Sequence, residues 1–200
     1  MIKKTIHTLL LALFVSNGYS SVTVQINSSG WGDSDTTAVA GMAWGIVVAS
    51  DGSSFGGTAE FGGVLESILN GFAMEDFATP SVPTQIGATS YYFLRAQSNT
   101  TTTGPLQGHM ASVQFDLDSE ITTGDAFGLL WFPSGDGVVS IGDSFGFQDL
   151  NETIPPDGFT TDPIGGSPGL ATFNVVPEPS TYAAIAGLMV LGFAVARRRR

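Results

Sequence analysis

Residues 126–132 read Ala-Phe-Gly-Leu-Leu-Trp-Phe, an unbroken apolar run between Asp125 and Pro133. A strand with one face in water alternates apolar and polar side chains, whereas a strand covered on both faces reads as a continuous apolar run. The run therefore predicts a strand in the interior of a sheet that is buried on both sides.

Further strand-like segments lie on either side of this run. Residues 21–27 (SVTVQIN) and 113–118 (VQFDLD) alternate apolar and polar side chains, which predicts strands with one face in water. Residues 42–49 (MAWGIVVA) form a longer apolar run and predict a central strand. Shorter candidates are residues 91–96, 138–141, 145–148 and 170–175.

Turn-forming residues such as Asp51-Gly52 and Pro155-Pro156-Asp157-Gly158 separate these segments. About eight short strands in one domain predict an all-β fold, a single β-sandwich of jelly-roll type. Residues 97–108 are expected to form a solvated loop, and residues 148–169 a long surface connection.

One segment breaks the strand pattern. Residues 64–77 place apolar side chains three and four positions apart, which favours one short amphipathic helix near 64–77. Gly71 weakens this prediction, and two short strands or a packed loop are the alternatives.

The N-terminus has the layout of a secretory signal peptide. Lys3 and Lys4 precede seven apolar residues at positions 9–15, and small residues follow. We expect cleavage after Ser20, with cleavage after Gly18 as the alternative. An uncleaved anchor is disfavoured because the apolar run is too short to span a bilayer.

The C-terminus carries three features in a fixed order: Pro177-Glu178-Pro179, an uncharged apolar run at 182–196, and four arginines at 197–200. A helix over the 15 residues of the run would be about 22 Å long. That is short for a membrane span, but arginine stems can snorkel to the interface. The arginines are expected to stay cytoplasmic, which places everything before the run outside. A plain C-terminal anchor is the alternative to a processed tail.

This order of motif, apolar helix and arginine cluster resembles the PEP-CTERM sorting signal of Gram-negative bacteria. The resemblance implies that Pro177, Glu178 and Pro179 are recognised by exosortase, a membrane-embedded cysteine transpeptidase that processes its substrates near the motif. These residues are acted upon and catalyse nothing. The family is associated with bacteria that produce exopolysaccharide and form biofilms or flocs, which implies a cell-surface or extracellular setting.

The expected domain organisation is thus a signal peptide at 1–20, a β-sandwich domain at 21–176 and a sorting signal at 177–200. Lys3, Lys4 and the terminal arginines account for six of the seven basic residues, so the domain carries only Arg95 against 17 acidic residues, a formal charge of −16. Such a domain has nothing to neutralise phosphates, which excludes nucleic acid as a partner. With no cysteine, it must be held together by its core.

Nucleophilic and transition-metal chemistry find little support in the sequence. His109 is the only histidine outside the signal peptide, and a triad or a zinc site needs more. Asp116, Asp118 and Glu120 have the spacing of one strand face, but three acids there usually form a solvated face rather than the carboxylate pair of a glycosidase.

Two binding hypotheses remain. Loop carboxylates at Asp33, Asp35 and Asp51 are weak candidates for Ca²⁺, which prefers hard oxygen ligands. Trp44 and Trp131 lie in apolar runs and are expected in the core. This leaves three aromatic residues as weak candidates for stacking on a sugar: Trp31, Tyr91 and Tyr92.

We therefore expect a non-enzymatic, exported structural protein of the cell surface or biofilm matrix, with no cofactor apart from the Ca²⁺ hypothesis. Its expected partners are exosortase, the inner membrane before processing, and extracellular polysaccharide. A carbohydrate-binding module is the alternative, and a glycan-active enzyme ranks third.

Overall fold

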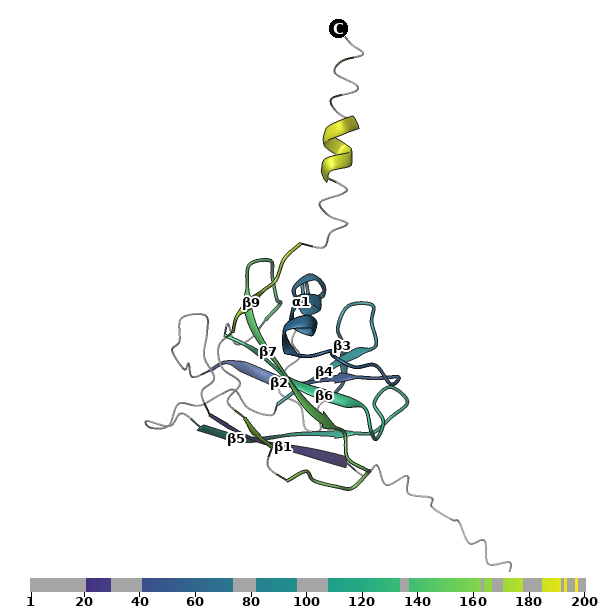
Figure 1. Ribbon diagram of the computed structural model, residues 1–200, viewed down its shortest axis with the longest axis vertical. Helices are drawn as coiled ribbons and strands as arrows, with labels where there is room; N and C mark the ends of the chain where they lie inside the picture. The colour runs from purple at the N-terminus through teal and green to yellow at the C-terminus, as the bar shows by residue number, and fades with distance from the viewer. Residues whose placement is uncertain are drawn as a thin grey trace, which may run out of the picture.

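The computed structural model describes residues 21–29, 41–73, 82–96, 108–133, 137–162, 164–166 and 171–177, together with 185–191, 193 and 197 (Figure 1). Strands predominate in these ranges, so the mostly-β prediction is confirmed. The single long helix of the body is α1 (Thr58–Ile68). The strands are β1 (Ser21–Ser29), β2 (Ala43–Ala49), β3 (Thr84–Gln85), β4 (Tyr91–Arg95), β5 (Gly108–Asp116), β6 (Ala126–Phe132), β7 (Ser144–Thr153), β8 (Ile164–Gly166) and β9 (Phe173–Asn174).

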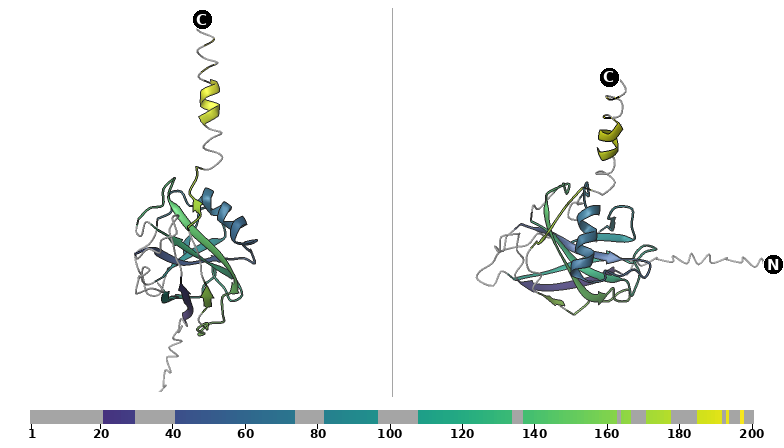
Figure 2. Two further views of the ribbon diagram at one scale, coloured as in Figure 1. Left: turned by 60° about the vertical axis from the view of Figure 1, so that its left-hand side comes forward. Right: turned by 45° about the horizontal axis from the view of Figure 1, so that its top comes forward.

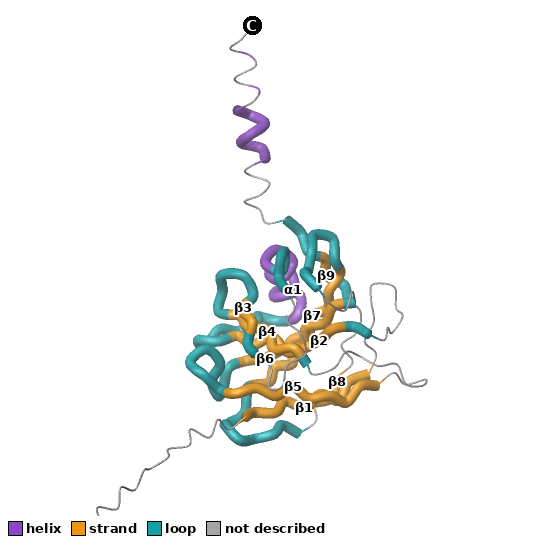
Figure 3. Tube along the Cα trace, turned by 180° about the vertical axis from the view of Figure 1, so that it is seen from behind, coloured by secondary structure: helices purple, strands orange, loops and turns teal. Residues whose placement is uncertain are grey.

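The strands form two sheets. One has three strands in the order β5-β1-β8, and the other has six in the order β3-β4-β2-β6-β7-β9. Neighbours pair antiparallel, except that β8 runs parallel to β1. Figure 3 shows β5, β1 and β8 as a separate layer beside the larger sheet.

An apolar core fills the space between the two sheets. The alternation in β1 turns Val22, Val24 and Ile26 inward, as the sequence predicts. From the larger sheet, Trp44 and Trp131 face this core as directly paired residues of β2 and β6, and both are fully buried. The prediction that these two tryptophans belong to the core is confirmed.

Helix α1 covers the opposite face of the six-stranded sheet, so the body has three layers (Figure 2). Phe61 and Leu65 of the helix are buried with Val47, Leu130 and other side chains from the outer face of the sheet. All seven residues of β2 are buried, and so are six of the seven in β6. The continuous apolar runs at 42–49 and 126–132 are explained by this double covering.

The helix overlaps the predicted range of 64–77 only at residues 64–68. It begins at Thr58, because Gly56 and Gly57 adopt positive φ angles of 70° and 115° and turn the chain into it. It ends at Ile68, and Gly71 follows with a φ of 80° that a helix cannot accommodate. The apolar spacing continues to Phe72, which is buried but lies beyond the helix. Residues 74–77 lie outside the described part of the chain.

Three other segment predictions need correction. Residues 138–141 form only an isolated bridge from Val138 to Ala73, not a strand. Residues 148–169 are more than a connection, because β7 continues to Thr153 and β8 lies at 164–166. The strand predicted at 170–175 is reduced to β9.

The described part of the body runs to Pro177. Val175 is buried, and the Val176 N–H donates to the Glu66 carbonyl oxygen of α1 at 2.8 Å. The domain boundary predicted after residue 176 stays a prediction, because residues 178–184 lie outside the described part of the chain. The signal peptide at 1–20 lies outside the described residues, and the run at 182–196 is described only at 185–191, 193 and 197.

Residues 185–191 are helical and exposed, and the short helix stands clear of the body (Figure 1). Among the residues that the structure describes, no helix combines the length and apolar character needed to cross a membrane. Because most of the remaining residues of 182–196 lie outside the described part of the chain, the membrane helix expected there stays a prediction.

Candidate functional site

Several of the candidate residues lie outside the described part of the chain: Trp31, Asp33, Asp35, Glu178 and Pro179. Pro177 is described and half-buried, and it directly follows Val176, which donates a hydrogen bond to Glu66. Asp51, Tyr91 and Tyr92 can be placed in full.

Tyr91 and Tyr92 lie on opposite faces of the six-stranded sheet. The Tyr91 ring packs against the helix-side core, with its centroid 4.4 Å from that of Phe61 and 6.2 Å from that of Phe55. Tyr92 packs against the core between the sheets. Because neighbours in a strand point in opposite directions, the two rings do not form one stacking platform.

Tyr92 lies in an acidic environment. Its partial burial raises the pKa of the phenol, and the carboxylates of Glu120, Asp51 and Asp118 raise it further. Asp51 itself adopts a φ of 58° in the turn after β2, and its Oδ2 accepts a hydrogen bond of 3.5 Å from the Ser90 hydroxyl. From the sequence, Asp51 was a candidate for Ca²⁺ binding, and Asp118 and Glu120 were considered for glycan hydrolysis. The fold brings all three carboxylates near Tyr92.

Asp116, Asp118 and Glu120 do not form a row on one strand. Strand β5 ends at Asp116, and Asp118 begins a turn in which its Oδ1 accepts the N–H groups of Glu120 at 2.7 Å and Ile121 at 2.8 Å. The carboxylate of Asp118 therefore stabilises a turn, and the carboxylate row considered for glycan hydrolysis is absent. Within the described ranges, no three His, Cys, Asp or Glu side chains are grouped to hold a metal ion.

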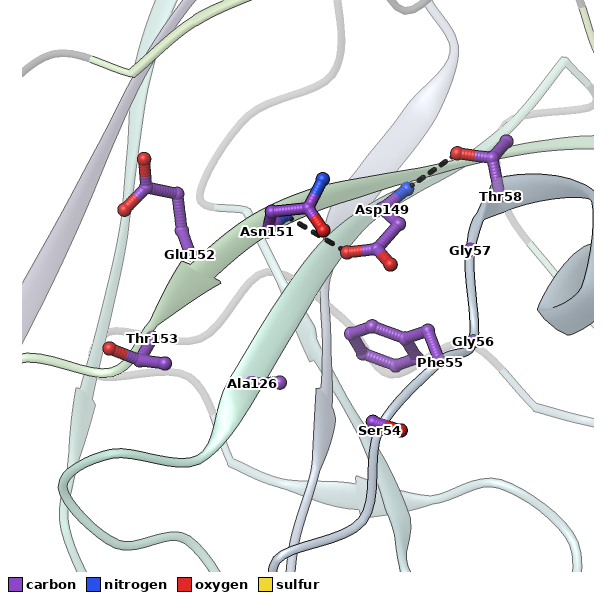
Figure 4. A pocket seen from close by; sticks show the side chains of 10 residues that line it. All are labelled: Ser54, Phe55, Gly56, Gly57, Thr58, Ala126, Asp149, Asn151, Glu152 and Thr153. Carbon is purple, nitrogen blue, oxygen red and sulfur yellow. Dashed lines mark hydrogen bonds between the residues drawn. The ribbon is translucent and has the colours of Figure 1, made fainter.

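A depression of about 510 Å³ opens where the loop before α1 meets the end of β7 (Figure 4). The loop contributes a hydroxyl-rich and glycine-rich wall, and β7 contributes acidic and amide side chains. Phe55, 3% exposed, lies at its base. The lining residues are Ser54, Phe55, Gly56, Gly57, Thr58, Ala126, Asp149, Asn151, Glu152 and Thr153.

A bulge in β7 shapes this depression. Phe127 of β6 pairs with Glu152, but the next residue, Gly128, pairs with Asp149, so two residues of β7 have no partner in the ladder. Asn151, one of the two, has a φ of 54° in the left-handed region that Asn tolerates. Bulges re-aim side chains, and here the bulge places Asn151 on the rim.

Two hydrogen bonds fix the wall of the depression. The Asp149 N–H donates to Thr58 Oγ1 at 3.0 Å, which links β7 to the first residue of α1. The Asn151 N–H donates to Asp149 Oδ1 at 2.9 Å. Figure 4 shows the Asp149 carboxylate between Asn151 and the Phe55 ring.

None of the residues that line this depression was among the candidate functional residues indicated by the sequence. Its β7 wall fell in the segment expected to be a surface connection, and its other wall lies far away in sequence. Gly56-Gly57 was the one available signal, because paired glycines mark a backbone that needs positive φ angles.

Comparison with known proteins adds no assignment. No protein-family model matches the chain, and no match was found among curated proteins or among solved structures.

Proposed function

We propose that the chain is an exported structural protein of the cell surface or extracellular matrix, sorted by a C-terminal signal of the PEP-CTERM kind. One observation carries the proposal: the chain is tied to α1 at Val176, whose N–H donates to the Glu66 carbonyl oxygen, and the Pro-Glu-Pro motif begins at the next residue. A processing enzyme needs an extended strip that is not part of a folded domain. Prolines at 177 and 179 favour such an extended backbone.

The character of the residues beyond the motif supports a membrane stage. Six large apolar side chains in the described part of the tail are exposed, among them Leu188 at 68% and Phe193 at 71%. Apolar surface of this kind is favourably removed from water, and a bilayer would remove it. The proposed route is insertion of residues 182–196 into the inner membrane with the arginines cytoplasmic, and then processing near the motif by an exosortase-type enzyme.

The body is proposed to be a non-catalytic β-sandwich of jelly-roll type. Two sheets with an apolar core between them support the sandwich class. The engagement of Asp118 in a turn supports a non-catalytic role, since it removes the carboxylate row that the sequence offered.

The test is the intact mass of the protein recovered from the cell surface. A C-terminus near 177–180 is the expected result, and a C-terminus still at Arg200 would leave a plain anchor. A variant with Pro177, Glu178 and Pro179 all replaced by Ala should keep its tail.

The matched control replaces a second segment of two prolines and an acid, Pro155-Pro156-Asp157, with three alanines. This control should be processed as the natural chain is. If both variants keep the tail, the effect does not depend on the motif, and the sorting proposal fails.

A further inference from the structure

We propose that the depression between β7 and the loop before α1 binds a neutral saccharide, such as the repeating unit of an uncharged polysaccharide. This inference goes beyond the proposed function, which assigns no ligand to the body. It concerns the body alone and does not depend on processing of the tail.

The first argument is the chemistry of the lining. A sugar hydroxyl is both a donor and an acceptor, so a site for sugars needs both kinds of group close together. Asp149 and Glu152 offer acceptors, and the Asn151 amide offers a donor and an acceptor. Hydroxyls at Ser54 and Thr153 can act either way.

The second argument is that the key polar group is held in place before any ligand arrives. Asp149 is fixed through its N–H by Thr58 and through its Oδ1 by the Asn151 N–H. The Asn151 side chain is exposed. Because these groups are already fixed, less conformational entropy is lost when a ligand binds.

The base of the depression is rigid and apolar. The Phe55 ring is packed against Phe61 with a centroid distance of 4.7 Å and against Phe147 with one of 5.3 Å. Ligand sites commonly combine such an apolar surface with a few fixed polar groups. The volume of about 510 Å³ is in the range of small-molecule sites.

Charge decides which saccharides fit. Asp149 and Glu152 line the depression, and Arg95, the one Lys or Arg within 21–176, is buried at 5% exposure. The body thus presents no basic side chain that could attract a uronate or a phosphorylated sugar, and its field repels them. Among the described residues, no three His, Cys, Asp or Glu side chains are grouped around a common point. A neutral saccharide is the remaining class.

The test is affinity electrophoresis of the full-length protein, extracted in a detergent without a sugar head group. The probes are gels containing dextran, soluble starch, galactomannan or xyloglucan, with polygalacturonate and alginate as anionic polymers. At least one neutral polymer should retard the protein, and neither anionic polymer should.

Two variants address the depression without disturbing the fold. Asp149→Asn removes the charge but keeps an oxygen that can accept the Asn151 N–H. Asn151→Gly removes the amide and suits the φ of 54°. Each should weaken binding about tenfold, as expected for the loss of one hydrogen bond to the ligand.

The control variant is Asp162→Asn, which makes the same charge change at an exposed residue two positions before β8. It should bind like the natural protein. No retardation by any neutral polymer, equal binding by the two site variants, or equal retardation by polygalacturonate would each overturn the proposal. None of these results bears on the mass of the processed chain, so the two proposals fail separately.

Discussion

Gly62 of helix α1 lies so close to the ring of Phe173 in β9 that a Cβ at position 62 would overlap the ring. Phe173 also stacks on Phe145 of β7, with ring centroids 5.5 Å apart and planes 22° from parallel. The helix and the last strand of the sheet are therefore in direct contact, and the absence of a side chain at position 62 makes the contact possible.

Replacing Gly62 with Ala should destabilise the protein. Alanine is the better helix former by about 1 kcal/mol, but overlap with a packed aromatic ring typically costs about 1–3 kcal/mol. We expect a net loss of about 1 kcal/mol in the free energy of unfolding, measured by urea denaturation.

Gly63 provides the matched control, because nothing lies within 4 Å of a Cβ built there. Gly63→Ala should raise stability by about 0.5–1 kcal/mol through helix propensity alone. If both substitutions stabilise equally, the close packing of α1 on Phe173 is disproved.

The link between Thr58 and Asp149 can be tested with a pair of substitutions. Thr58→Val removes the oxygen that accepts the Asp149 N–H and should lower stability by about 0.5–1.5 kcal/mol. Thr58→Ser keeps the oxygen and should retain most of the stability. A chemical denaturation midpoint measures both, and equal midpoints for Val and Ser would rule out a stabilising role for this bond.

Tyr92 should titrate above the ordinary tyrosine pKa of 10.0. Burial is the largest cause of the raised pKa, followed by the charges of Glu120, Asp51 and Asp118. Absorbance at alkaline pH should show one late phenol transition that disappears in Tyr92→Phe. Glu120→Gln should move the transition towards the ordinary value but not all the way, because burial persists.

The same shift makes a prediction about stability. Since the folded state holds the phenol proton more tightly than the unfolded state, stability falls as pH rises from the ordinary pKa to the raised one. Below pH 10.0 the group contributes no pH dependence. Melting temperatures over this alkaline range should therefore fall more for the natural protein than for Tyr92→Phe, and parallel curves would contradict the assignment.

The strands that the sequence located best are those that the fold buries on both faces. For β6 the predicted bounds agree with the structure, and for β2 they differ by one residue, because an unbroken apolar run marks both ends clearly. The end of β7 was missed because its last residues are polar, and the bulge at Asn151 disrupts the two-residue period. The start of α1 was missed because its N-cap residue is Gly57, which has no side chain and so lacks the capping oxygen of Ser, Thr, Asp or Asn that marks a helix start in a sequence.

The candidate site could not be predicted from the pattern of neighbouring residues in the sequence. Ser54 comes from the loop before α1 and Thr58 from the start of the helix, whereas Asp149 and Asn151 come from a strand about 90 positions later. The fold brings them together. Likewise, alternation along β4 separates Tyr91 from Tyr92, although they are adjacent in sequence. Pairing between distant strands, rather than composition, decides which side chains meet.

Two truncations test where the folded body ends. Removing residues 177–200 should leave the melting temperature unchanged, because the bond from Val176 to Glu66 is the last hydrogen bond along the described part of the body. Removing residues 173–200 takes away β9, the buried Val175 that follows it, and the backbone hydrogen bonds that join Val175 to Asp143 and Gly142 and Val176 to Glu66. Loss of the Phe173 and Val175 side chains should cost about 3 kcal/mol or more.

If the first truncation also lowers the melting temperature, the body extends into the sorting motif, and an enzyme could reach that motif only after part of the fold opens.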